Sequence, residues 1–100
     1  MALIDPMNKG QVERLVLLIE ECGEVIQAAS KVLRHGWEGS YDNGEKNRAA
    51  LERELGDVLA ILSLMGERNS DIHLNAVRVH SGQKLEKLTA SNNRFVYFQS

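Results

Sequence analysis

The chain has 100 residues, of which 43% are hydrophobic and 26% charged, which is the composition of one folded domain and excludes global disorder. Its 12 Lys and Arg against 14 Asp and Glu argue against a nucleic-acid-binding protein, because such proteins carry a basic surface that neutralises phosphates. No run approaches the roughly 20 apolar residues of a membrane span. With no apolar signal segment near the first residue and one cysteine, the expected location is the cytoplasm.

Three segments rich in helix-forming residues are separated by turn-forming residues. Asn8 followed by Gln11 indicates a helix N-cap with a capping box. Residues 36–44 are dense in Gly, Asp, Asn and Ser, which predicts a loop, and Ser70 is the expected cap of the last helix. The predicted helices cover residues 11–34, 46–68 and 72–89.

These segments predict an all-α fold, in which a helical hairpin is followed by a further helix, within a single domain spanning residues 1–100. The tail 92–100 is left out of this prediction, because residues 96–100 resemble part of a protease-tag cleavage site. Only one proline and few aromatic residues (5%) are present, which disfavours strands.

The first helix is apolar on two sides when its residues are placed about 100° apart around the axis. One apolar stripe is predicted to face the core, and Cys22 within it is expected to be a buried small hydrophobic residue. The members of this stripe are Val12, Leu15, Ile19, Cys22, Ile26 and Leu33. The opposite apolar arc contains Leu17, Val25 and Val32, and Glu21 and Glu24 fall within it or at its edge.

The second helix is also apolar over a wide arc, and it places two carboxylates among apolar residues. One of its apolar stripes contains Leu51, Leu55, Val58, Leu59 and Leu62. Glu54 and Asp57 lie three positions apart, on a face that they share with Ala50, Ile61 and Met65. Across a hairpin, these two residues and the pair on the first helix would form a cluster of four carboxylates. Two unit charges about 5 Å apart repel each other by roughly 3 kcal/mol at an effective dielectric of about 20.

Either several of the four carboxylates are protonated, or a cation lies among them and offsets this repulsion. Ligation by oxygen alone suits Mg²⁺, with Mn²⁺ as a substitute. A di-iron site is disfavoured, because it needs Glu-x-x-His on two helices and none of the three histidines has a Glu three positions earlier. The alternative for each pair taken alone is an ordinary solvated helix face.

The order Glu20-Glu21-Cys22-Gly23-Glu24 and then Glu54-Leu55-Gly56-Asp57 resembles the E-E-x-x-E and E-x-x-D motifs of the MazG-like, all-α nucleoside triphosphate pyrophosphohydrolases. The resemblance covers roughly residues 10–90. It implies that Mg²⁺ is bound by the same four carboxylates that the helical positions single out, which are Glu21, Glu24, Glu54 and Asp57. Glu20 would then either orient a water molecule or contact one of the metal ligands without binding the metal itself. The alternative is that Glu20 is an ordinary surface glutamate.

The resemblance also implies an activity, in which water attacks the α-phosphorus of a (deoxy)nucleoside triphosphate and releases the monophosphate and pyrophosphate. The implied role is the clean-up of nucleotide pools. Candidate substrate-binding residues are Lys31, Lys84 and Lys87 for phosphates and Trp37 for the base. The alternatives are solvated surface charges for the lysines, and packing against the hairpin or a neighbouring subunit for Trp37.

Two helices that are apolar on both sides cannot bury all of their apolar surface within one small chain. We therefore expect a homo-oligomer, a dimer or tetramer, in which a partner subunit completes a core of the four-helix-bundle type. The resemblance implies the same kind of assembly. The alternative of a different class is a small, non-catalytic helical oligomerisation module.

Overall fold

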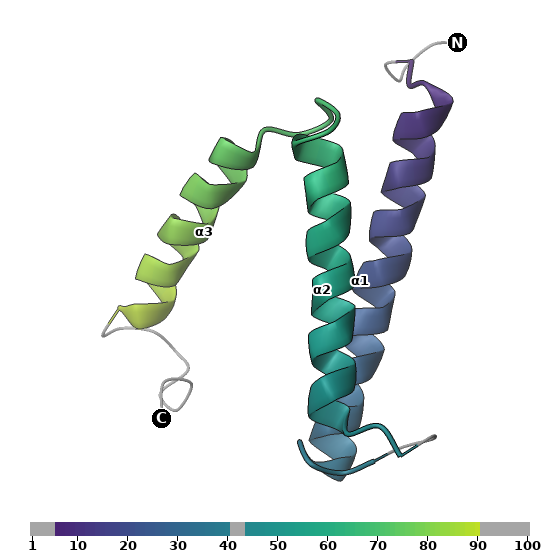
Figure 1. The fold of residues 1–100 in the computed structure, drawn as a ribbon. Coiled ribbons are helices and arrows are strands. Elements are labelled where there is room, and N and C mark those ends of the chain that lie inside the picture. The colour runs from purple at the N-terminus through teal and green to yellow at the C-terminus, as the bar shows by residue number, and fades with distance from the viewer. Residues whose placement is uncertain (1–5, 41–43, 91–100) are drawn as a thin grey trace.

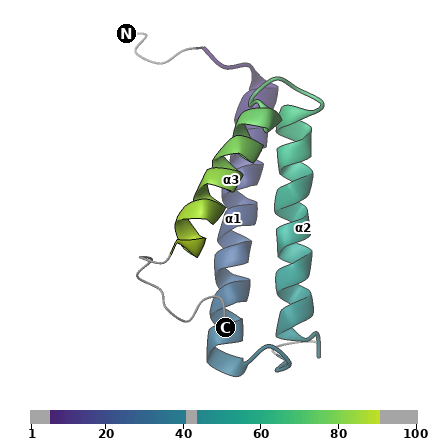
Figure 2. The ribbon, with the colours of Figure 1, turned by 90° about the vertical axis from the view of Figure 1, so that its left-hand side faces the viewer.

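The computed structural model describes residues 6–40 and 44–90. Three helices and no β-strand occur in these ranges: α1 (Lys9–His35), α2 (Asn47–Gly66) and α3 (Leu74–Thr89). The all-α prediction is therefore confirmed, while the predicted tail at 92–100 lies outside the described residues. α1 and α2 form an antiparallel hairpin, and α3 diverges from this hairpin after the turn that follows α2 (Figures 1 and 2).

The start of α1 is set by the predicted capping box. The Asn8 side chain accepts from the backbone N–H of Gln11 (2.8 Å), and the Gln11 side chain accepts from the backbone N–H of Asn8 (3.1 Å). The helix ends at His35 and is capped by Gly36, whose φ of 84° is in the region that favours glycine.

The connection from α1 to α2 is organised around Asn47, which is buried. Its backbone N–H donates to the carbonyl of Gly39 (2.8 Å), and its side-chain amide donates to the carbonyl of Gly36 (3.0 Å). A side chain at Gly39 would place Cβ 2.2 Å from the carbonyl oxygen of His35, so this close approach requires glycine. The loop is therefore folded back onto the first turn of α2.

The third helix differs from the sequence-based prediction at its start. α3 begins at Leu74 after His73, with no side-chain cap, so the prediction that Ser70 is the cap was wrong. The helix continues through Ser81 and Gly82 without a break. It meets α2 where Leu74 covers Gly66, at which a Cβ would lie 2.4 Å from Leu74 Cγ. α3 has no buried residue, so it packs on the hairpin mainly through its first turn.

The predicted core stripe of α1 was wrong for this chain by itself. Ile19, Ile26 and Leu33 are 71%, 67% and 89% exposed, and Cys22 is exposed as well. The buried apolar residues of the described part are Ala28 of α1 and Met65 of α2. The reason is geometric: α1 carries two apolar arcs, and one partner helix can bury only one of them.

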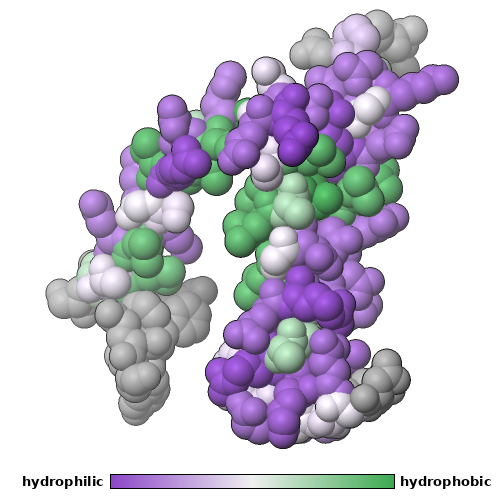
Figure 3. Space-filling view, viewed as in Figure 1, coloured by the Kyte–Doolittle hydropathy of each residue, from purple (hydrophilic) through white to green (hydrophobic). Residues whose placement is uncertain are grey.

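Hydrophobic residues thus remain on the surface of the single chain. Figure 3 shows them over the upper part of the hairpin and on α3, between polar regions. The exposed members include Leu55 and Leu59 of α2 and Val77, Val79 and Leu85 of α3. None of the helices in the described residues has the length and apolar character needed to cross a membrane.

Candidate metal centre

Three carboxylates meet between α1 and α2. Glu21 of α1 and Glu54 and Asp57 of α2 each offer an oxygen, and these oxygens lie within 4.8 Å of one another. The three-residue spacing places Glu54 and Asp57 on one face of α2. The antiparallel hairpin brings Glu21 opposite them.

The three side chains differ in their access to water. Glu54 is buried, with 7% of its surface exposed, Glu21 is half-buried, and Asp57 is exposed. Burial raises the pKa of Glu21, and the negative charges of Asp57 and Glu54 raise it further. Packing and mutual repulsion therefore both oppose ionisation of Glu21, and a cation between the carboxylates would reverse this effect.

The donor set fits a hard divalent cation. All three groups offer oxygen, and no His or Cys of the described residues joins the group. Mg²⁺ and Mn²⁺ prefer such ligands, and Mg²⁺ usually keeps several positions for water or substrate phosphates. The exposed side of Asp57 gives the group an opening to solvent, so the arrangement can hold a cation within reach of a substrate.

Comparison with known families agrees with this geometry. Residues 11–90 match the model of the MazG nucleotide pyrophosphohydrolase domain, over both helices that carry the carboxylates. The chain belongs to this MazG family. No curated protein and no solved structure matches the chain significantly. Membership indicates a nucleotide pyrophosphohydrolase, which agrees with the family resemblance found in the sequence.

The other two glutamates of the first MazG motif lie outside the group of three. Glu24 is exposed and is not among the carboxylates whose oxygens converge, although its charge also raises the pKa of Glu21, after burial and the charges on α2. Glu20 is exposed, and its charge has the weakest effect of the causes acting on Glu21. The role of Glu24 as a ligand and that of Glu20 stay predictions.

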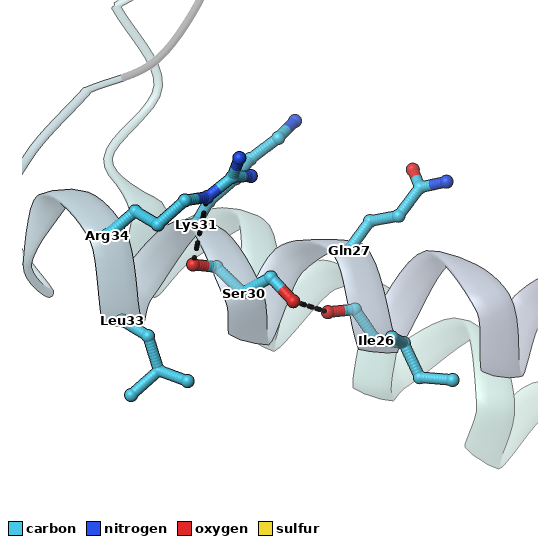
Figure 4. A pocket seen from close by; sticks show the side chains of 6 residues that line it. All are labelled: Ile26, Gln27, Ser30, Lys31, Leu33 and Arg34. Atoms are coloured by element: carbon cyan, nitrogen blue, oxygen red, sulfur yellow. Dashed lines mark hydrogen bonds between the residues drawn. The ribbon is translucent and has the colours of Figure 1, made fainter.

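Lys31 lies on the second half of α1, at a shallow surface hollow of about 610 Å³. Figure 4 shows Lys31 and Arg34 extending to one side of the helix, while Ile26 and Leu33 lie on the other. The positive charge of Lys31 also acts on Glu45, where it helps to lower the pKa of that carboxyl after the larger effect of Arg53. Lys31 therefore lies near Glu45, a residue just before α2. Its role in binding phosphate stays a prediction.

Trp37 is half-exposed and contacts α2. The guanidinium carbon of Arg48 lies 4.9 Å from the ring centroid, and the backbone N–H of Arg48 donates to the carbonyl of Trp37 (2.9 Å). Arg48 also pairs with Glu38 of the same loop (2.7 Å). The alternative of packing against the hairpin therefore describes part of the Trp37 environment, while about half of the residue stays exposed. Its role in binding the base stays a prediction.

Lys84 and Lys87 are exposed residues of α3. Because α3 diverges from α2 along its length (Figure 1), the structure does not bring them beside the acidic group within one chain.

The sequence reasoning missed one neighbour of the carboxylates. Arg53, next to Glu54 in the chain, forms an ion pair with it and a second ion pair with Glu45. An arginine beside an acidic motif is too common to single out, and residue spacing could not reveal that Glu45 reaches the same guanidinium.

Proposed function

We propose that this protein is a Mg²⁺-dependent nucleoside triphosphate pyrophosphohydrolase, which cleaves a (deoxy)nucleoside triphosphate between the α and β phosphates and yields the monophosphate and pyrophosphate. Mn²⁺ would substitute for Mg²⁺. The observation that carries the proposal is the convergence of Glu21, Glu54 and Asp57 between the two helices that match the MazG family. The cellular role would be the clean-up of nucleotide pools in the cytoplasm.

The residues of the metal centre would have different roles according to their exposure. A bound Mg²⁺ supplies a Lewis acid for phosphate oxygens and favours charge that develops on the leaving pyrophosphate. Buried Glu54 and half-buried Glu21 would hold the cation from inside the hairpin, while Asp57 would hold it at the exposed edge. Glu24, one turn along α1 from Glu21, would complete the ligand set, and Glu20 would orient water.

Substrate contacts would come from residues around this centre. Lys31 would bind phosphate oxygens, and the exposed part of Trp37 would stack on the base. Lys84 and Lys87 would reach phosphates from a second subunit, because α3 leads away from the hairpin that precedes it.

The assembly would be a homo-oligomer, a dimer or tetramer. The exposed stripe of Ile19, Ile26 and Leu33 is the surface that a second copy would cover, and it would complete a core of the four-helix-bundle type.

The deciding experiment incubates the protein with Mg²⁺ and each nucleoside triphosphate in turn and measures pyrophosphate. We expect pyrophosphate release from at least one nucleotide, and its loss in Asp57→Asn and Glu24→Gln. Glu52→Gln, which changes an exposed glutamate of α2 outside the acidic group, serves as the matched control. A folded protein that binds no Mg²⁺ and turns over no nucleotide would instead support the non-catalytic oligomerisation module.

A further inference from the structure

We propose that Arg53 is a positioning residue that holds the carboxylate of Glu54 in the acidic group, and that Glu45 in turn holds Arg53. The inference rests on the proposed function, since it concerns a ligand of the proposed metal centre. It adds two residues to that centre that neither the motifs nor the spacing of the sequence indicated.

The contacts form a chain from the loop to the centre. Arg53 Nη1 donates to Glu54 Oε1, and on its other side Arg53 Nη2 donates to Glu45 Oε1 at 3.0 Å, with Nε 3.4 Å from Glu45 Oε2. The planar guanidinium carries five N–H donors in a fixed fork, so one arginine can engage two carboxylates at once. A lysine ammonium has no such planar set of donors, so it cannot pair with both carboxylates in the same way.

Burial explains why Glu54 needs such a partner. Its side chain is nearly enclosed, whereas those of Arg53 and Glu45 are about half-exposed. A buried carboxylate has lost most of its water and depends on hydrogen bonds from the protein. Because a carboxylate has two oxygens, pairing one of them with Arg53 leaves the other for a cation.

Glu45, the residue that holds Arg53, is itself fixed in position by its neighbours. Glu45 lies just before α2, beside the antiparallel bridge between Ser40 and Lys46 and the buried Asn47. The backbone at Glu45 is thus tied to the loop and to the first turn of α2. Arg53 and Glu54 are consecutive, so their side chains leave the helix about 100° apart. The Arg53 side chain therefore has to bend around the helix for its guanidinium to reach Glu54. Glu45 stabilises that bent conformation.

The opposite role for Arg53 would be that of a counter-charge, which occupies Glu54 and competes with the cation. The two roles predict different effects of mutation. A positioning residue raises cation affinity, and losing it typically weakens binding by roughly 10–100-fold. A competing charge lowers cation affinity, so that its removal tightens binding and its replacement by lysine changes nothing.

The test measures Mn²⁺ affinity directly, by electron paramagnetic resonance of free Mn²⁺, without reference to turnover. Arg53→Lys and Glu45→Gln should each weaken binding by about 10-fold. If Glu45 acts only through Arg53, the double variant should bind no more weakly than Arg53→Lys alone. The matched controls are Arg48→Lys and Glu38→Gln, which change the neighbouring exposed ion pair, and they should bind Mn²⁺ like the wild type.

The outcomes separate this inference from the proposed function. Wild-type affinity or tighter binding in Arg53→Lys, with the Mn²⁺ site still abolished by Asp57→Asn, would overturn the positioning role and leave the metal centre intact. Absence of Mn²⁺ binding in the wild type would overturn the metal centre and this inference together. Circular dichroism and the unfolding midpoint without cation, both unchanged in Arg53→Lys, would show that the loss of affinity does not arise from a loss of fold.

Discussion

Arg14 of α1 and Asp71 form a two-point ion pair that ties the first half of α1 to the turn after α2. Arg14 Nε and Nη2 donate to the two carboxylate oxygens of Asp71, the second at 2.9 Å. Both side chains are largely enclosed, and the backbone N–H of Asp71 donates to the carbonyl of Met65 (3.0 Å). The pair therefore closes the end of the hairpin that lies opposite the connecting loop.

This pair predicts a specific dependence of stability on pH. The hydrogen bonds from Arg14 hold the pKa of Asp71 below its usual value of 3.8, although burial acts in the opposite direction. Because the folded-state pKa is the lower one, the contribution of Asp71 to the free energy of unfolding is fully present above the unfolded-state pKa. It is lost as the pH falls through the folded-state pKa.

Asp71→Asn should therefore lower the thermal unfolding midpoint at pH 7 by on the order of 5 °C. The difference from the wild type should shrink between pH 5 and pH 2, and thermal melts followed by circular dichroism at both ends of that range measure it. Glu38→Gln removes an exposed ion pair and should have little effect. A difference for Asp71→Asn that stays constant down to pH 2 would contradict the assignment.

The acidic group predicts that a substitution at Asp57 raises the stability of the metal-free protein while it removes the proposed function. Asn at this position removes one of three converging negative charges, so the metal-free protein should unfold at a higher temperature than the wild type. Millimolar Mg²⁺ should then stabilise the wild type but not Asp57→Asn, because only a folded state that binds the cation is stabilised by it. Differential scanning calorimetry with and without Mg²⁺ measures both effects.

The control for Asp57→Asn is Glu52→Gln, which should leave the stabilisation by Mg²⁺ unchanged. Equal stabilisation of the wild type and Asp57→Asn by Mg²⁺ would argue against a cation at this group.

The exposed stripe of α1 predicts that the protein assembles through it. Ile26→Glu places a charge among the exposed apolar residues of this stripe and should convert the oligomer to monomers at micromolar concentration. Static light scattering measures the mass of each variant. Gln27→Glu, at the adjacent position, which is already polar and exposed, should leave the mass unchanged. A wild type that is monomeric under these conditions would contradict the predicted homo-oligomer.

Local interactions made much of this architecture predictable from the sequence. The capping box at Asn8 and Gln11 depends on residues three positions apart, and the shared face of Glu54 and Asp57 follows from the helical repeat alone. The motifs on the two helices also indicated the family, because their order and spacing can be recognised in the sequence without any knowledge of packing.

Tertiary structure decided what depends on partners far apart in the chain. Helical periodicity showed two apolar arcs on α1, but only the packing of α2 determined which of them is buried, and it left Ile19 and Ile26 outside. Likewise, the approach of Glu45 to Arg53 follows from the fold of the loop around Asn47. Spacing along one helix determines which residues share a face, whereas the choice of the buried face is made by the element that packs against it.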